Sequence, residues 1–487
     1  MTESRTTPAM EVDASPTKTF FVDMLTRDIE LEDAILDLLD NCIDGIQRTI
    51  KGREASDKPY SGFEAKISFS ESGFKIEDNC GGIPLEVAQN YAFRMGRPQN
   101  GNENDLSINA IGTYGIGMKR AIFKMGRSSK VTSQTAADSF RVNISPEWVD
   151  LDAWTLPFEL IERTNKDNGT TIEITDIRES IREEFTSSKS TLNNSLFGKI
   201  AHYYSYIIRK GFGVWINNRK VEASSFELLW EGEHKISSSS QEIIAPYIYT
   251  SKYEEVSIEL IVGFYRKNIA TEDEIEQENE GKRTSSENAG WTIVCNDRVV
   301  VYCDKTRLTG WGEAKVPSYH PQFISIAGIV HFRCHDPRKL PITTTKRGLD
   351  LSSDVYLYTK DFMREGLKLF IDYTNKWKND RPQEQEIVKN TYLTDPNIIL
   401  SKVPTEVWTN TKKRGGAKNT NIVDEKYYKP SLPLPDKGSQ IDRGKSIRFS
   451  RKPNEVKIVS GHLFGDEDRD ANEVGNECFE IILKEAQ

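Results

Sequence analysis

Several features that identify common classes of protein are missing from this chain of 487 residues. Its six cysteines lie far apart and form no Cys-x-x-Cys pair, which argues against a zinc site and against a disulfide framework. No apolar run approaches the roughly 18 residues that span a membrane. The first 18 residues are polar and lack the apolar core of a signal peptide. We therefore expect a cytoplasmic protein that does not enter a membrane.

An excess of positive charge is also missing. The chain has 65 basic and 74 acidic residues, a net charge of −9, which argues against a protein that coats nucleic acid but leaves room for a local basic patch. Hydrophobic residues make up 37% and charged residues 29%, as in soluble globular proteins, and the length allows two or three domains.

What the chain does contain is three short segments in a fixed order. They are residues 37–45 (Asp-Leu-Leu-Asp-Asn-Cys-Ile-Asp-Gly), 78–84 (Asp-Asn-Cys-Gly-Gly-Ile-Pro) and 112–119 (Gly-Thr-Tyr-Gly-Ile-Gly-Met-Lys). Apolar residues recur at three- and four-residue steps between residues 20 and 50, which predicts a helix around the first segment. Residues 65–77 alternate like a strand that ends in the second segment, and a helix is predicted after the third, over residues 118–125.

Asp37 and Asn41 share one face of the predicted helix because they are four residues apart. Asn41 offers a neutral oxygen to Mg²⁺, which prefers hard oxygen ligands. Asp37 could orient or deprotonate an attacking water. The alternative interpretation is an ordinary solvated helix face.

Asp78 follows a predicted strand and precedes a tight turn. A buried carboxylate at this place is costly without a partner, and the exocyclic amine of adenine is a suitable one. Gly82 would let the backbone pass close to the base. A surface Asp-Asn turn is the alternative.

Gly112, Gly115 and Gly117 precede the third predicted helix. The N–H groups at a helix start make an anion site for phosphates, to which Lys119 or Arg120 would add positive charge. Glycine triplets also occur in dinucleotide folds, but here no strand directly abuts the triplet and the preceding loop is long and polar.

The order of these segments resembles that of the GHKL ATPases, the superfamily of gyrase B, the heat-shock chaperone of the same fold, histidine kinases, MutL and the MORC proteins. The resemblance implies an α/β (α+β) sandwich of the Bergerat type that binds ATP and Mg²⁺. It implies Asp37 as the catalytic base, Asn41 as the metal ligand and Asp78 as the adenine partner. The other residues that it places at the nucleotide are Asp44, Gly82, Ile83, Gly112, Tyr114, Gly115, Ile116, Gly117, Met118, Lys119 and Thr170.

Two positions depart from the family pattern. Asp37 stands where Glu is usual and is one methylene shorter, so that hydrolysis is slow or the helix sits closer. Cys80 occupies the first glycine of Asp-x-Gly-x-Gly and would be strained at a positive φ, unless Gly81 absorbs the turn. Residues 96–117 correspond to the ATP lid. The polar residues around that lid are Arg94, Arg97 and Asn109.

A second domain is predicted beyond the serine-rich residues 237–240. Residues 290–299 resemble a strand-turn-strand piece of the MORC and MutL transducer domain, and residues 340–348 resemble its loop that reaches the γ-phosphate. Lys346 would then be a catalytic sensor lysine that stabilises charge on the transferred phosphoryl group. A basic exposed loop is the alternative.

The C-terminal part has a different composition. Residues 402–457 contain 14 Lys and Arg against six acidic residues, with few aliphatics, which predicts a flexible arm that binds DNA or RNA backbone or a solvated linker to a partner protein. The predicted organisation is a flexible segment 1–18, a GHKL ATPase domain 19–235, a transducer domain with a ribosomal-protein-like β-α fold 236–385, and a basic arm with a short ordered tail 386–487.

The expected function is Mg²⁺-dependent ATP hydrolysis that closes a homodimer, a MORC- or MutL-like clamp on nucleic acid, used by analogy in prokaryotic defence. The alternatives are a non-catalytic or very slow ATP-gated interaction module and a chaperone-like ATPase, although the last hundred residues leave little room for a chaperone's other domains. A histidine kinase is disfavoured because none of the six His precedes the pocket, and a nuclease because no acidic-His metal motif is present.

Overall fold

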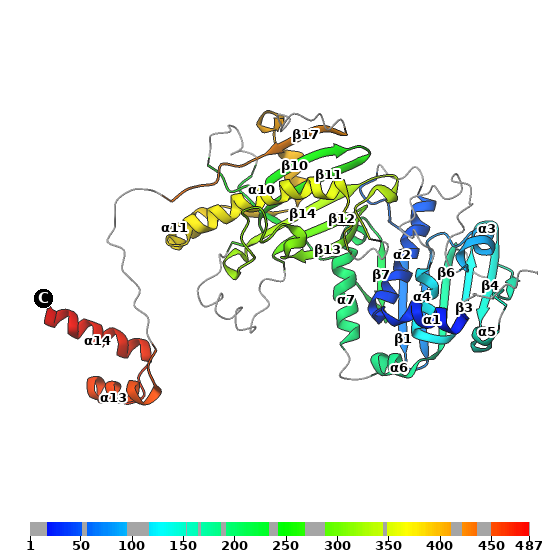
Figure 1. The fold of residues 1–487 in the computed structure, drawn as a ribbon, viewed down its shortest axis with the longest axis horizontal. Coiled ribbons are helices and arrows are strands. Elements are labelled where there is room, and N and C mark those ends of the chain that lie inside the picture. The colour runs from blue at the N-terminus through cyan, green and yellow to red at the C-terminus, as the bar shows by residue number, and fades with distance from the viewer. Residues whose placement is uncertain are drawn as a thin grey trace, which may run out of the picture. The chain divides into compact units, whose positions relative to one another are not determined.

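The computed structural model describes residues 17–50, 56–94, 116–151, 153–163, 167–186, 191–232, 242–267, 288–343, 348–410, 421–435 and 450–486. The chain divides into two compact units, Met1–Pro435 and Asp436–Gln487. The first unit is built on two large sheets and the helices that cover them (Figure 1).

The first sheet has eight strands in the order β5-β4-β3-β6-β2-β1-β7-β8. Neighbouring strands are antiparallel, except that β1 and β7 run parallel. The strands are β1 Glu64–Ser70, β2 Gly73–Asp78, β3 Gly126–Gln134, β4 Ser139–Ile144, β5 Phe158–Leu160, β6 Gly169–Ile177, β7 Gly213–Ile216 and β8 Arg219–Lys220.

Helices cover one face of this sheet, and the apolar stripe of α2 explains why. The residues of that stripe are at most 4% exposed: Ile35, Leu38, Leu39, Cys42, Ile43 and Ile46. The other face of the sheet carries exposed charged pairs such as Lys75–Glu77. This arrangement confirms the predicted α/β sandwich. The helical segments of this half are α1 Lys18–Arg27, α2 Leu31–Thr49, α3 Leu85–Val87, the π-helix η1 Ala88–Ala92, α4 Gly117–Met125, α5 Pro146–Asp150, α6 Glu179–Thr186, α7 Leu192–Tyr203 and α8 Ser205–Arg209.

Two predicted elements are each divided in the structure. The helix expected over residues 20–50 breaks between Arg27 and Leu31, where Glu30 takes an extended conformation and Ile29 is buried. The single strand expected over residues 65–77 is a hairpin, in which Ile67 pairs with Ile76. The inward residues change from odd positions in β1 (Ile67, Phe69) to even positions in β2 (Phe74, Ile76), and this change of phase marks the hairpin that the single predicted strand missed.

The second sheet has seven strands in the order β13-β12-β14-β11-β10-β17-β16, with β12 and β14 parallel. Its central strands are apolar on both sides because both faces are covered. One face packs against the long helix α10 and the other meets a cluster that includes Tyr206 of α8. The strands are β10 Tyr247–Tyr253, β11 Val256–Phe264, β12 Gly290–Cys295, β13 Arg298–Asp304, β14 Ile326–Arg333, β16 Thr409–Asn410 and β17 Ile422–Tyr428, and β9 Leu228–Trp230 pairs separately with β15 Tyr392–Thr394. The helices are α10 Asp354–Trp377, α11 Arg381–Val388 and α12 Pro396–Lys402, with 3₁₀ turns Arg307–Thr309, Pro321–Phe323, Pro337–Lys339 and Thr405–Val407.

Part of the predicted arm is folded. Strand β17 lies inside the segment expected to be flexible. It pairs with β10 and is part of the seven-stranded sheet. Residues 386–435 therefore belong largely to the first unit, which differs from the predicted boundary at residue 386. Of the 14 basic residues in 402–457, Lys402, Lys429, Arg451, Lys452 and Lys457 are described and exposed, and Lys426 is half-buried. The others lie outside the described residues: Lys412, Lys413, Arg414, Lys418, Lys437, Arg443, Lys445 and Arg448.

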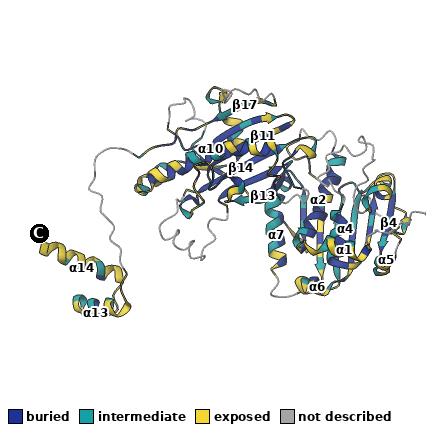
Figure 2. Cartoon of the chain, in the orientation of Figure 1, coloured by how far each residue is buried: buried dark blue, intermediate teal, exposed yellow. Residues whose placement is uncertain are grey.

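The second unit contains a helix pair, α13 Pro453–Phe464 and α14 Ala471–Ala486. Most residues of both helices are exposed, including Ile458, Phe479 and Ile482 (Figure 2). No helix among the described residues has the length and apolarity needed to cross a membrane.

Candidate active site

Helix α2 carries the first motif at the edge of the helical layer. Asp37 is 7% exposed and Asp44 is 6% exposed, whereas Asn41 between them is exposed. The helix approaches the second motif closely at Gly45, where an added Cβ would lie 2.5 Å from the carbonyl oxygen of Cys80. A side chain at position 45 would therefore push α2 away from the end of β2.

The start of α4 packs directly on Asp37. An added Cβ at Gly117 would lie 3.4 Å from the Asp37 Cβ and carboxylate. One turn into α4, Arg120 donates from Nη2 to Asp37 Oδ2 at 2.5 Å, and this ion pair is mostly buried. The sequence predicted positive charge here but not its partner, because the two residues are 83 positions apart. The expected base is thus a carboxylate with a counter-charge already beside it.

Asp78 lies at the end of β2. Among the described residues, none of the groups that donate a hydrogen bond to its carboxylate is a cation. Its Oδ1 accepts from the Cys80 amide at 2.7 Å and from the Thr170 amide at 3.4 Å, and the Cys42 thiol donates to Oδ2 at 3.5 Å. Burial raises the pKa of Asp78 to about 6, and these hydrogen bonds only partly oppose the rise. An external N–H donor that reached this carboxylate would relieve that cost.

In the turn after Asp78, the positive φ angles fall on glycine residues. Gly81 and Gly82 have φ of +99° and +74°, and Cys80 is not among the described residues with positive φ. Cys80 is therefore unstrained in place of the usual glycine, as expected if Gly81 absorbs the turn. Arg48 of α2 donates to the Gly82 carbonyl at 3.2 Å, which ties the turn to the helix.

Ser133 joins the predicted residues around this turn, although no motif pointed to it. Its hydroxyl accepts from the Ile83 amide at 2.8 Å and pairs with the Thr170 hydroxyl at 3.0 Å. Ser133 is buried on β3, two strands from β2, so only the sheet order brings it to the turn. The Thr170 hydroxyl thus supports the turn, while the Thr170 amide contacts Asp78.

Lys119 occupies a different place from the one that phosphate binding requires. It is 1% exposed, and its ammonium group donates to the carbonyls of Ala92 and Arg94 at 2.9 and 2.6 Å. Burial lowers the pKa of this amine to about 8. In this arrangement Lys119 holds the end of the preceding π-helix, and the charge expected from Lys119 or Arg120 goes to these carbonyls and to Asp37.

The remaining predicted residues divide between described and undescribed parts. Ile116 precedes α4 and is half-buried, and Met118 is buried in its first turn. The other residues of the glycine motif, the lid and the sensor loop lie outside the described residues: Gly112, Tyr114, Gly115, Arg97, Asn109 and Lys346. The pocket is therefore defined here by α2, the start of α4 and the turn after β2.

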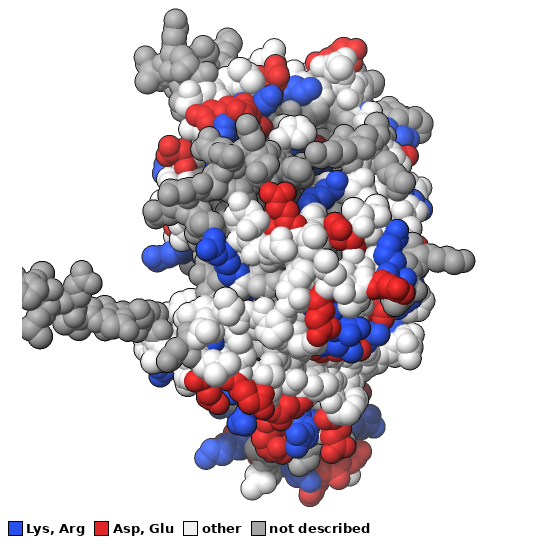
Figure 3. All heavy atoms as spheres, turned by 90° about the vertical axis from the view of Figure 1, so that its right-hand side faces the viewer, with Lys and Arg blue, Asp and Glu red and all other residues white. Residues whose placement is uncertain are grey.

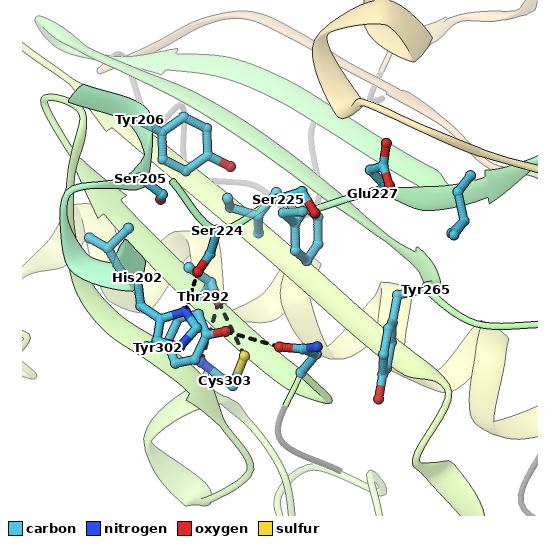
Figure 4. A pocket seen from close by; sticks show the side chains of 15 residues that line it. His202, Ser205, Tyr206, Ser224, Ser225, Glu227, Tyr265, Thr292, Tyr302 and Cys303 are labelled. Atoms are coloured by element: carbon cyan, nitrogen blue, oxygen red, sulfur yellow. Dashed lines mark hydrogen bonds between the residues drawn. The ribbon is translucent and has the colours of Figure 1, made fainter. Parts of the chain in front are cut away.

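Two hollows among the described residues are poorly suited to a triphosphate, and Asp78 is part of the lining of the larger one. One of about 300 Å³ lies on the polar face of the first sheet, where its described lining holds four acidic residues and Lys66 as the basic one. The other, of about 170 Å³, lies between α8 and the second sheet, and Glu227 is the charged residue of its described lining (Figure 4). Both would repel phosphate.

The surface near the first sheet is electrostatically mixed. On the face drawn in Figure 3, the positive and negative side chains of the described residues are interspersed. The described residues also contain no cluster of three or more His, Cys, Asp or Glu side chains that could hold a metal ion by itself. A cation at Asn41 would therefore need oxygens from a ligand to complete its shell.

Comparison with known families gives one match. Residues 29–167 match the model of a family described as histidine kinase-, DNA gyrase B- and HSP90-like ATPases. The matched region includes Asp37, Asn41, Asp78 and Gly117 and covers less than a third of the chain. No curated protein matches the chain.

Proposed function

Because residues 29–167 are a GHKL-type ATPase domain, we propose that this protein binds Mg²⁺ and ATP against α2 and hydrolyses ATP slowly. The observation that carries the proposal is the convergence of all three motifs on that helix. Asp37 packs against Gly117, and Cys42 contacts Asp78. The proposed adenine partner and the proposed phosphate-side residues thus both contact this helix.

Asp78 is the proposed adenine partner. Its side chain is half-buried, and it accepts hydrogen bonds from the Cys42 thiol and from two backbone amides. The exocyclic amine of adenine would add the donor that this carboxylate lacks, as a charge-assisted hydrogen bond.

Asn41 is the proposed Mg²⁺ ligand. Its exposed amide oxygen is a hard donor, and a single protein ligand is enough when phosphate oxygens and waters complete the shell. When bound, Mg²⁺ would neutralise charge on the transferred phosphoryl group. The first-turn N–H groups of α4, which begins at Gly117, would face the phosphates.

Asp37 is the proposed group that orients the attacking water. The ion pair with Arg120 occupies one of its two carboxylate oxygens, so that oxygen is less available to a water. The shorter Asp side chain and this ion pair together support slow hydrolysis. The same ion pair is the observation that favours a second candidate, a non-catalytic ATP-gated interaction module.

The finer parts of the function extend beyond the ATPase domain. We propose that Lys346 contacts the γ-phosphate, that ATP joins two copies into a clamp, and that the basic residues after Lys402 contact DNA or RNA. The exposed pair Arg451 and Lys452 supports the last point. A role in prokaryotic defence rests on analogy with MORC-like proteins.

Calorimetric titration of Mg·ATP into wild type, Asp78→Asn and Glu77→Gln tests the adenine site. Glu77 is the matched control, since it neighbours Asp78 but pairs with Lys75 on the polar face of the sheet. Asp78→Asn should bind about 10- to 100-fold more weakly, the equivalent of a hydrogen bond to a charged group. Glu77→Gln should bind like wild type. Absence of heat with folded wild type would contradict the proposed function.

Phosphate release then separates the two candidates. Asp37→Ala should release phosphate at least about 100-fold more slowly than wild type if Asp37 acts on the water. Binding without any release by wild type would favour the interaction module. Mass in solution should double with a non-hydrolysable ATP analogue if ATP closes a dimer.

A further inference from the structure

The turn between β12 and β13 carries three consecutive polar residues, Asn296, Asp297 and Arg298. Asn296 and Asp297 have φ of +46° and +68°, as the two central residues of a type I′ turn do. Asn and Asp tolerate this conformation better than most other residues. The turn is thus well defined, and its three side chains contact three different parts of the first unit.

Arg298 forms a buried ion pair with Asp40 of α2. Its Nε donates to Asp40 Oδ1 at 3.0 Å, and both residues are 2% exposed. The Tyr204 hydroxyl donates to the same oxygen at 2.6 Å, and the guanidinium lies 4.1 Å from the centroid of the Tyr204 ring. Burial disfavours the charged guanidinium, but the charge and hydrogen bond of Asp40, together with Tyr204 and Tyr203, outweigh it and raise the pKa of Arg298. Neither charge can lose its partner without a large cost.

Asp40 lies beside the groups proposed to act on ATP. It directly precedes Asn41 and follows Asp37 by three residues in the same helix. Because neighbouring residues of a helix share hydrogen-bonded turns, a displacement of Asp40 displaces Asp37 and Asn41 with it. Arg298 thus determines, from the second sheet, where this part of α2 lies.

Asp297 binds the first half of the unit at two further points. Its Oδ2 accepts from the Tyr60 hydroxyl at 3.0 Å and from the Lys210 ammonium at 2.7 Å. Tyr60 precedes β1 and Lys210 follows α8. The Tyr60 amide also donates to the Lys210 carbonyl at 3.1 Å, so Asp297 attaches the turn to one place where these two segments meet.

Asn296 connects the turn to the end of β14. Its side-chain amide accepts from the Cys334 N–H at 3.0 Å and donates to the Cys334 carbonyl at 2.9 Å. Cys334 begins the segment that leads to residues 340–348, where the sequence predicts the γ-phosphate loop. The base of that loop is closed by a hydrogen bond from the Thr343 amide to the Gly348 carbonyl at 3.0 Å.

We propose that Asn296 and Arg298 are positioning residues of the nucleotide site. Arg298 places the helix that carries the proposed metal ligand, and Asn296 fixes the turn that presents Arg298 by joining it to Cys334 at the end of β14. The inference rests on the proposed function, because it concerns how the groups of that site are aligned. The turn aligns the phosphate end of the site, whereas the adenine end depends on Asp78 and its own backbone partners.

The test compares Arg298→Lys with Tyr204→Phe. Both variants remove a hydrogen bond to Asp40 Oδ1, but only Arg298→Lys changes the turn. Arg298→Lys should bind Mg·ATP about tenfold more weakly, the equivalent of one hydrogen bond to a charged group. Its affinity for ADP in the presence of EDTA should stay at the wild-type value. Tyr204→Phe should preserve both affinities.

A second variant, Asn296→Gly, tests the positioning role even if Arg298→Lys does not fold. Asn296→Gly keeps the turn conformation and removes both hydrogen bonds to Cys334, and it should slow phosphate release about tenfold without changing ADP affinity. Equal loss of both affinities in folded Arg298→Lys, or loss of neither, would overturn the positioning role.

Failure of the proposed function has a different signature. A wild type that binds neither nucleotide contradicts the ATP site itself. Hydrogen exchange of the nucleotide-free protein then decides the positioning role. Faster exchange of α2 amides in Arg298→Lys than in Tyr204→Phe supports it, and equal exchange in the two variants overturns it.

Discussion

Asp40 and Asp78 are two carboxylates in the motif segments that meet opposite surroundings. Asp40 receives hydrogen bonds from a guanidinium and a tyrosine hydroxyl, so its charge is balanced inside the protein. Asp78 receives hydrogen bonds from two amides and a thiol, and its pKa rises to about 6. The carboxylate whose charge is balanced serves the structure, whereas the unbalanced one is suited to an external ligand.

The largest effect on the free energy of unfolding is expected when the negative charge of Asp40 is removed. Asp40→Ala leaves the Arg298 guanidinium buried without its counter-charge, which should lower the free energy of unfolding by about 3–5 kcal/mol. Chemical denaturation at pH 7 measures this loss. Asp78→Ala should cost clearly less, because no buried cation loses its partner there. Equal losses for the two variants would remove the distinction between the two sites.

A smaller effect is expected from the pH dependence of Asp78. The raised pKa means that the native state binds a proton more tightly than the unfolded state does, so this group stabilises the fold below its ordinary pKa of 3.8. That contribution is lost as the pH rises towards about 6, and the loss amounts to about 3 kcal/mol. Denaturation of nucleotide-free protein at pH 4.5, 6 and 7.5 measures it.

Asp78→Asn is the control for that titration, because it cannot ionise. The wild type should lose stability relative to Asp78→Asn between pH 4.5 and 6, and the difference should be constant above about pH 7. Parallel pH profiles would show that Asp78 titrates normally and that its surroundings resemble those of an exposed acid.

The local parts of the site could be predicted from the sequence because they depend on spacing along the chain. The four-residue step from Asp37 to Asn41 places both on α2, and the apolar stripe of that helix identifies its buried face. Gly81 and Gly82 likewise have the positive φ angles of the turn after β2. The family match at residues 29–167 agrees with the resemblance drawn from these motifs.

The partners of these residues could not be predicted, because they come from distant parts of the chain. Arg120 reaches Asp37 across 83 positions and Arg298 reaches Asp40 across 258. A charge in a sequence carries no record of its neighbour, so the motif resemblance assigns roles to Asp37 and Asp44 but none to Asp40. Strand β17 was missed because it lies next to the short edge strand β16 and carries polar, half-exposed residues that resemble a linker.

The smallest effect is expected at Cys80, where the family pattern has glycine. Cys80→Gly keeps the amide that donates to Asp78 but removes a buried thiol and adds freedom to the unfolded chain. The free energy of unfolding should fall by about 1–2 kcal/mol. ATP affinity should stay within about twofold of wild type, because the short hydrogen bond from the amide of residue 80 to Asp78 is kept and only the weak thiol contact is lost. Denaturation and calorimetry on the same sample measure both. A large loss of affinity with little loss of stability would mean that the thiol, and not the backbone, prepares Asp78 for its ligand.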